Sequence, residues 1–194
     1  MPLKLMYITN NPTVAVIAEK YGVDRIWVDL ESIGKEERQY GMNTVKSNHT
    51  LEDVSVIRNV LSSAQLLVRI NPLYDGTEKE VGEVVKRGAD LIMLPMFRTA
   101  DEAKKFVDIV GGRAKTILLV ETIEAERSLE DIVEVPGVDE IHIGLNDLHL
   151  AYKKKFMFQL LAEGNVDNMC SILRKKGIPF GFGGIARLNE GTLP

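Results

Sequence analysis

The chain is poor in cysteine, tryptophan and histidine, with one, one and three copies in 194 residues. The single cysteine, Cys170, excludes an internal disulfide and fits a reducing cytoplasm, which is the location we expect. The apolar runs are of strand length, too short to span a membrane, and residues 1–10 lack a signal-peptide pattern. A formal net charge of −4 provides no basic surface, and the basic run at 153–155 is too short to suggest one. We therefore expect neither a membrane nor a nucleic-acid partner.

The composition that remains is that of an ordinary globular protein, with 45% apolar and 27% charged residues. A chain of this length can bury one sizeable core, so residues 1–194 are predicted to form a single domain. Cys170 lies among apolar residues at helical spacing, which favours a small core residue over a nucleophile.

Short β-branched apolar runs alternate with amphipathic helical stretches along the whole chain. The strand candidates are residues 3–9, 25–30, 65–70, 90–96, 116–122, 140–145 and 179–185. The helical patterns lie near residues 12–21, 51–61, 77–87, 100–110, 124–134 and 166–176. Strands that are apolar on both faces and separated by helices indicate a parallel sheet covered on both sides. A partial repeat, Gly-x-Asp, begins at Gly22, Gly88 and Gly137 and opens every second strand, where the glycine is expected at positive φ.

The predicted fold class is therefore α/β, a TIM (β/α)8 barrel. Seven strand–helix units can be counted, and the sequence ends just after the seventh strand, whereas a barrel needs eight strands to close. We expect the eighth strand and the final helix to be missing, through truncation or disorder. An open doubly wound sheet is the alternative, but residues 9–12 read Thr-Asn-Asn-Pro where that fold usually has a glycine-rich phosphate loop.

Two carboxylates occupy the ends of predicted strands, Glu121 after the fifth strand and Asp147 after the sixth. The C-terminal ends of barrel strands meet on one face, so the two acids are expected to converge there. Hard oxygen ligands with room for water and substrate suit Mg²⁺ or Mn²⁺ better than Zn²⁺. The alternative is a helix-capping Asp147 and a surface Glu121.

Other polar residues follow the remaining strands. Asp29 and Glu31 follow the second strand, and burying acids is costly unless they are paired or bind a metal. Arg69, at the end of the third strand, offers a planar donor fork for a carboxylate or a developing enolate oxygen. Its alternative role is a salt bridge to one of the acids. Asn71 follows the third strand and Asn146 follows the sixth strand, and both are candidate substrate-binding residues.

The three histidines and the tryptophan have different expectations. His149 lies two residues beyond the acid of the sixth strand and is the candidate acid–base group. His49 precedes a capping-box pattern and is expected at a solvated loop end, unless the loop 32–49 folds over the site. His142 alternates with apolar residues inside a strand and is expected to be structural, and Trp27 is expected to pack against a helix.

Five motifs occur in order along the chain: VDLES (28–32), VRINP (68–72), GADLIMLPM (88–96), LLVETIEA (118–125) and GLNDL (144–148). Together they resemble the HpcH/HpaI aldolase and citrate lyase β-subunit family, which belongs to the phosphoenolpyruvate/pyruvate superfamily of barrels. The resemblance implies an eight-stranded barrel with a divalent metal on Glu121 and Asp147 and a keto-acid contact from Arg69. It also implies a homo-oligomer, trimeric or hexameric. The apolar edges of a seven-stranded barrel give weaker support, because they must be covered either by the chain's own missing tail or by a neighbour.

The segment after the second strand distinguishes two branches of that family. Class II pyruvate aldolases carry Asp-Gly-Glu-His there, and the histidine assists proton transfer. The present segment, Asp29-Leu30-Glu31-Ser32, is closer to the citrate lyase branch and leaves the aldolase base unassigned.

We predict a Mg²⁺- or Mn²⁺-dependent carbon–carbon lyase of the aldolase type, cleaving or forming 2-oxo acids through a pyruvate-like enolate. Asp29 and Glu31 are expected to hold water molecules on the metal. One alternative is an acyl-CoA lyase of the citrate, malyl or citramalyl-CoA type. Another is a non-catalytic barrel subunit that binds a metabolite.

Overall fold

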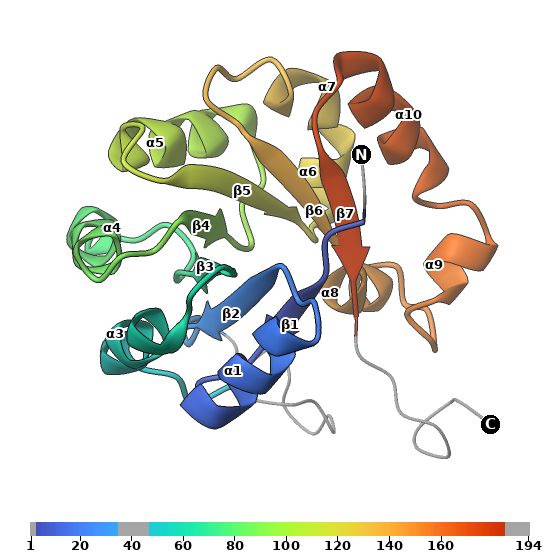
Figure 1. Ribbon diagram of the computed structural model, residues 1–194. Helices are drawn as coiled ribbons and strands as arrows, with labels where there is room; N and C mark the ends of the chain where they lie inside the picture. The colour runs from blue at the N-terminus through green and yellow to red at the C-terminus, as the bar shows by residue number, and fades with distance from the viewer. Residues whose placement is uncertain (1–2, 35–46, 185–194) are drawn as a thin grey trace. The chain divides into compact units, whose positions relative to one another are not determined.

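The computed structural model of the chain describes residues 3–34 and 47–184 (Figure 1). Within these residues seven strands lie in sheet order β1-β2-β3-β4-β5-β6-β7, which is also their order in the sequence. Their bounds are β1 Met6–Ile8, β2 Arg25–Asp29, β3 Gln65–Arg69, β4 Leu91–Leu94, β5 Lys115–Val120, β6 Glu140–Gly144 and β7 Phe180–Gly183. Sequential parallel strands are the arrangement that successive strand–helix units of a barrel produce.

Helices follow the strands as predicted, and every expected helix is present. Their bounds are α1 Pro12–Lys20, α3 Leu51–Val60, α4 Thr77–Lys86, α5 Ala100–Val110, α6 Ile123–Arg127, α7 Leu129–Ile132, α8 Leu145–Ala151, α9 Gln159–Ala162 and α10 Asp167–Lys176. The predicted helix 124–134 is two short helices that meet at Ser128. The sequence did not predict α8 or α9. No helix in the described part of the chain is long and apolar enough to cross a membrane.

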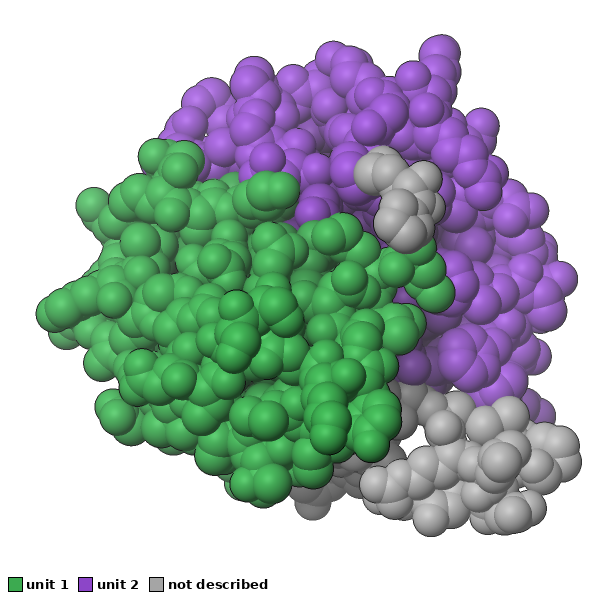
Figure 2. All heavy atoms as spheres, in the orientation of Figure 1, with its two compact units in different colours: residues 1–95, 109–116 green, residues 96–108, 117–194 purple. Residues whose placement is uncertain are grey.

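The chain divides into two compact units, which Figure 2 shows in different colours. Unit 1 comprises Met1–Pro95 and Ile109–Thr116, and unit 2 comprises Met96–Asp108 and Ile117–Pro194. Each unit has strands with side chains buried on both faces, as the sequence predicted. In unit 2, Cys170 is partly buried on α10, and burial raises the pKa of its thiol, which agrees with a packing role.

In unit 1 the parallel register places Asp29 opposite Arg69 and Trp27 opposite Leu67. Residues two apart on a strand share a face, so Trp27 lies on the same face as Asp29. The Trp27 ring centroid is 5.2 Å from the Arg69 guanidinium carbon. The ring thus lies against a charged group on the sheet, and the expectation that Trp27 packs against a helix stays a prediction.

The Gly-x-Asp repeat has the conformation predicted from the sequence. Gly22, Gly88 and Gly137 have φ values of 92°, 87° and 90°. The following Asp24 accepts a hydrogen bond at Oδ2 from Leu5 N, and Asp90 accepts one from Leu66 N, each at 2.7 Å. In both places the glycine turns the chain into a strand, and the aspartate satisfies a backbone donor at the start of the neighbouring strand.

Candidate functional site

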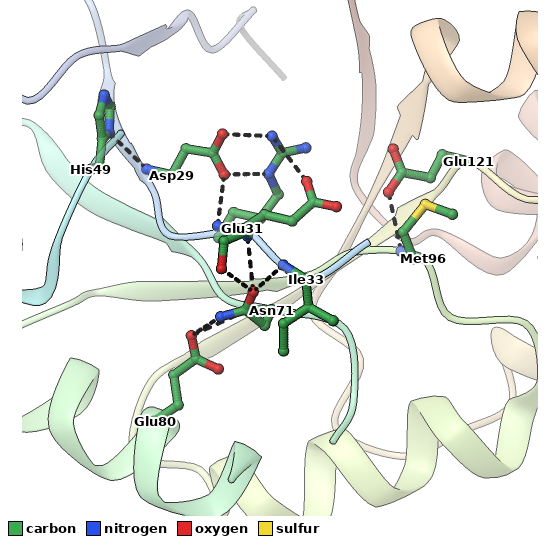
Figure 3. Close-up of polar contacts among 10 residues, drawn as sticks. Asp29, Glu31, Ile33, His49, Asn71, Glu80, Met96 and Glu121 are labelled. Atoms are coloured by element: carbon green, nitrogen blue, oxygen red, sulfur yellow. Dashed lines mark hydrogen bonds and ion pairs between the residues drawn. The ribbon is translucent and has the colours of Figure 1, made fainter. Parts of the chain in front are cut away.

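In unit 1 an arginine and two acids meet at the ends of β2 and β3 (Figure 3). Arg69 donates from Nε to Asp29 Oδ1 and from Nη2 to Asp29 Oδ2, both at 2.8 Å. Its Nη2 also lies 3.3 Å from Glu31 Oε2. The contact with Asp29 is bidentate, which is the strongest geometry for an arginine–carboxylate pair.

This cluster is withdrawn from water. Asp29 and Glu31 are 1% and 4% exposed, and the Arg69 side chain is 13% exposed. Glu31 N donates to Asp29 Oδ1 at 3.2 Å, which ties the two acids together. Arg69 therefore relieves the repulsion between the acids, which the sequence had suggested a metal would do. The salt bridge proposed as the alternative role of Arg69 is present, while substrate contact stays a prediction.

His49 lies against this cluster, whereas the sequence favoured a solvated loop end and gave contact with the site as the alternative. Asp29 N donates to His49 Nδ1 at 3.0 Å, so the neutral ring carries its proton on Nε2. The capping box after His49 is present between Thr50 and Asp53. Only the solvated position was wrong, because His49 is half-buried. The contact joins residues 20 positions apart, and no local spacing in the sequence signals it.

Asn71, a predicted substrate-binding residue, is bound to the protein itself. Its Oδ1 accepts hydrogen bonds from Ser32 N at 2.9 Å, Ile33 N at 3.0 Å and Ser32 Oγ at 3.2 Å. Its Nδ2 donates to Glu80 Oε1 at 2.8 Å, and its backbone N donates to the same oxygen at 3.3 Å. Sequence analysis missed Glu80, which lies on α4 among ordinary surface-type residues. Figure 3 shows Asn71 between Glu80 and the segment that follows β2.

In unit 2 the carboxylate of Glu121 is buried and oriented at the end of β5. Glu121 is 3% exposed, and its Oε1 accepts a hydrogen bond from Met96 N at 3.1 Å (Figure 3). Met96 has φ 55°, a left-handed conformation that is uncommon for residues other than glycine and asparagine. A Cβ added to Gly144 would lie 2.8 Å from Glu121 Cβ and 2.9 Å from Oε2. The glycine therefore makes room for the carboxylate.

Asp147 and Asn146 were predicted at a strand end. The structure places both residues in the first turn of α8 instead. β6 ends at Gly144, which is the N-cap of that helix. The sequence suggested otherwise because the apolar run of β6 continues into the first helical residue. Both side chains are half-buried. An acid in the first turn interacts favourably with the helix dipole, but the N-cap of α8 is Gly144, so the alternative of a helix-capping Asp147 is wrong.

The other two histidines are buried in unit 2. His149 is 8% exposed, and its Nδ1 lies 3.2 Å from the carbonyl oxygen of Leu145, one turn earlier in α8. His142 lies inside β6 and is 7% exposed, as expected of a structural residue. The acid–base role of His149 is untested by these contacts and stays a prediction.

The residues present suit a divalent cation such as Mg²⁺. Among the described residues no group of three or more histidine, cysteine or acidic side chains could hold a metal. Magnesium does not need such a group, because proteins commonly bind it through one or two carboxylates and leave other positions to water and substrate. Glu121 and Asp147 are the two carboxylates that would provide such a donor set, and Gly144 leaves the space that the Glu121 carboxylate occupies.

Residues 4–158 match the HpcH/HpaI aldolase/citrate lyase family, and the chain belongs to it. The family is of the carbon–carbon lyase type, and its members typically depend on a divalent metal. Among curated proteins, none matches the chain in sequence.

Solved structures share the fold at low sequence identity. An HpcH/HpaI aldolase from Desulfitobacterium hafniense has a TM-score of 0.72 and 16% identity, covering 95% of this chain and 79% of that one. An HpcH/HpaI aldolase/citrate lyase family protein from Burkholderia cenocepacia gives 0.74 and 16%, with coverage of 92% and 78%. The citrate synthase SbnG gives 0.73 and 15%, with coverage of 96% and 78%. The chain thus has a partial TIM-barrel-like aldolase fold with seven parallel strands, as predicted.

Proposed function

We propose that this chain is a divalent-metal-dependent lyase of the aldolase type that cleaves or forms 2-oxo acids through a pyruvate-like enolate. Membership of the family supports the reaction type. The observation that carries the proposal is the position of the Glu121 carboxylate. It is buried, it accepts a hydrogen bond from the backbone N–H of Met96, which has a positive φ, and it lies against Gly144. Burying a carboxylate in this way is costly for a merely structural residue.

Glu121 and Asp147 would hold Mg²⁺ or Mn²⁺, which when bound supplies positive charge for the negative charge that develops on the substrate. The backbone N–H of Met96 keeps one oxygen of Glu121 in place. That contact fixes the orientation of the carboxylate.

Arg69 would bind a carboxylate or keto oxygen of the 2-oxo acid. Asp29 and Glu31 hold its guanidinium from two directions, and the Trp27 ring lies beneath it. A charged donor with a fixed orientation stabilises developing negative charge without reorganising during the reaction. The two acids therefore act first as positioning groups for Arg69, and their role in holding water remains a proposal.

Two histidines are candidates for the proton transfer that the family motif leaves unassigned. His49 is a neutral imidazole beside Asp29, with its proton on Nε2. His149 is buried on α8, the helix that also carries Asp147. We propose His149 as the acid–base group and His49 as its rival.

An acyl-CoA lyase of the citrate, malyl or citramalyl-CoA type is the second candidate. The segment Asp29-Leu30-Glu31-Ser32 favours it, because Ser32 replaces the aldolase histidine and is bound to Asn71 through both N and Oγ. A metabolite-binding subunit without activity is the third candidate. It is favoured by the extent to which Asp29 and Glu31 already neutralise Arg69.

The deciding experiment is a turnover assay of the purified chain with Mg²⁺ or Mn²⁺. Its substrates are oxaloacetate, a panel of hydroxy-oxo acids, and malyl-, citramalyl- and citryl-CoA. Cleavage of a free 2-oxo acid that stops when EDTA is added supports the first proposal, and thioester turnover supports the second. Binding of a 2-oxo acid without turnover supports the third. Glu121→Gln protein purified in parallel controls for contaminating enzymes.

A further inference from the structure

We propose that Glu80, acting through Asn71, is a positioning residue that fixes the acidic segment after β2 and so sets the orientation of Arg69. The catalytic consequence of this inference rests on the proposed lyase function. The positional part rests only on contacts within unit 1.

The contacts form a continuous path from α4 to the acids. Glu80 Oε1 accepts two hydrogen bonds from Asn71, one from its backbone N–H and one from its side-chain Nδ2. Asn71 Oδ1 then accepts the backbone N–H groups of Ser32 and Ile33. Ser32 directly follows Glu31, whose own backbone N–H donates to Asp29. A displacement at Glu80 would therefore be transmitted to both acids that hold Arg69.

The acceptor at position 80 also determines which way the Asn71 amide faces. An amide has a donor end and an acceptor end, and the reverse orientation would place the NH₂ group against the N–H groups of Ser32 and Ile33. It would also place the amide oxygen against the Glu80 carboxylate. Two donor–donor contacts and one acceptor–acceptor contact oppose that orientation. Glu80, together with the N–H groups of Ser32 and Ile33, thus favours the orientation in which Asn71 holds the segment after β2.

Burying the Glu80 carboxylate costs free energy of folding, which argues against incidental packing. Glu80 is 8% exposed, its Oε1 is occupied by the two Asn71 N–H groups, and Tyr74 is the other polar group that faces its carboxylate. Burial raises the pKa of its carboxyl group, although the hydrogen bonds from Asn71 and Tyr74 offset part of that effect. Natural sequences accept such local costs chiefly where a site needs the group.

Three variants and one control test the inference. Glu80→Gln keeps an amide oxygen as acceptor, whereas Glu80→Met removes the acceptor at similar volume, and Asn71→Ala removes the intermediate residue. Glu83→Met is the matched control, because Glu83 lies on the same helix and pairs only locally with Arg87. The readouts are amide hydrogen exchange at Ser32 and Ile33 by NMR, steady-state kinetics with Mg²⁺, and thermal melting.

We expect Glu80→Met and Asn71→Ala to speed exchange at Ser32 and Ile33 by about tenfold or more, the effect of one lost hydrogen bond. Both should lower kcat by on the order of 10–100-fold with a smaller change in KM, because the donor fork is misplaced. Glu80→Gln should stay within about twofold of wild type in both readouts, the margin for a retained acceptor. Glu83→Met should change neither. Combining Glu80→Met with Asn71→Ala should match Asn71→Ala alone, because both changes interrupt one path.

Glu80→Met protein that melts lower but keeps wild-type exchange at Ser32 and Ile33 would overturn the inference. Unchanged kcat alongside fast exchange would overturn its catalytic part. If Glu80→Met does not fold, Asn71→Ala provides the same readouts. If the wild-type chain turns over no substrate, the proposed function fails, and the exchange rates alone decide whether Glu80 positions the segment.

Discussion

Two roles of Arg69 were predicted from the sequence, substrate contact and an internal salt bridge. The observed position of its side chain is compatible with both. Its bidentate pair with Asp29 and its contact with Glu31 hold the guanidinium at the end of β3. These roles are compatible, because a guanidinium fixed by two buried acids is preorganised for an anionic ligand. The residue types of this cluster, and their positions at the ends of adjacent strands, could be predicted from the sequence. It could not decide between the roles, because that depends on distances of a few tenths of an ångström.

Arg69→Lys tests which role dominates. A lysine keeps the charge but loses the fork, so we expect kcat to fall on the order of 10²–10³-fold with a smaller change in KM. The free energy of unfolding should also fall, by up to about 3–5 kcal/mol, because a buried acid loses part of its pairing. Steady-state kinetics and urea unfolding provide the two measurements.

Arg58→Lys is the matched control, because Arg58 pairs with Asp90 in the same unit but with side chains 29% and 41% exposed. It should lower the free energy of unfolding by less than about 1 kcal/mol and leave the kinetics unchanged. An Arg69→Lys protein that is destabilised yet has wild-type kcat would reduce Arg69 to a structural salt bridge.

The metal assignment is tested by Glu121→Gln and Asp147→Asn. Each should abolish Mn²⁺ binding and leave the fold intact, because the replacements are isosteric and remove one negative charge. The amide introduced by Glu121→Gln would still offer an oxygen to Met96 N, so loss of the local fold is not expected. Calorimetric titration with Mn²⁺ measures the effect, and Glu124→Gln, an exposed acid on α6, is the control. Wild-type affinity in either variant would show that the ligand assignment is wrong.

Glu80 should make stability depend on pH in a defined direction. Its pKa is raised above the ordinary value of 4.5, first by burial, and the groups that face it are Asn71 and Tyr74. Between the unfolded and folded pKa values the folded state binds more protons, so the free energy of unfolding decreases as pH rises through that window. Above the folded pKa the penalty is constant.

Urea unfolding of wild type and Glu80→Gln, compared from about pH 4 upward, measures this contribution. We expect the stability of wild type to decline relative to Glu80→Gln as pH rises, and then to level off. A difference that is independent of pH would mean that Glu80 ionises in the folded protein as it does in the unfolded chain.

Among elements, strand and helix positions were predictable because their apolar periodicity is strong. The strands begin and end within a few residues of the predicted bounds, and the Gly-x-Asp turns have the expected positive φ. The helix α8 was missed because an apolar run of strand length leads directly into it, and short apolar runs do not distinguish strand from helix. That error placed Asp147 on a strand end. The contact of His49 with Asp29 joins residues 20 positions apart, and the sequence carries no local pattern that would favour it over a solvated position.

The junction of β6 and α8 supports a prediction about Gly144. It has φ −85°, which any residue can adopt, so Gly144→Ala introduces a methyl group without backbone strain. That methyl group would lie within 2.9 Å of Glu121 Oε2 and Cβ and must displace the side chain. We expect Mn²⁺ affinity to fall by about tenfold or more, which is what a loss of roughly 1.4 kcal/mol produces.

Gly82→Ala is the matched control, because an added Cβ there meets no atom within 4 Å. Gly82 lies inside α4, so the change should stabilise the protein by about 0.5–1 kcal/mol through helix propensity and leave Mn²⁺ binding unchanged. Retained affinity in Gly144→Ala would show that the Glu121 carboxylate tolerates displacement, and that the glycine has no part in the metal site.

For the whole molecule, we expect a homo-oligomer, a trimer or hexamer, as the motif resemblance implied. Unit 1 carries apolar side chains that are exposed on two consecutive elements, β1 and α1. Tyr7 is 48% exposed, Val16 44% and Ile17 51%. Exposed apolar side chains can mark a contact with another chain when they form one surface. In a closed assembly each copy presents the same surface, so one substitution alters every interface at once.

Ile17→Lys is therefore expected to shift the chain toward smaller species, because a charge buried in an apolar interface loses its hydration without a partner. Sedimentation velocity at micromolar concentration measures the distribution, and far-UV circular dichroism checks that α1 is still folded. Ala162→Lys, at an exposed position of α9, adds the same charge elsewhere and should leave the assembly unchanged. Wild-type protein that sediments as a single chain would contradict the oligomer. An assembly that persists unchanged in Ile17→Lys would place the interface outside β1 and α1.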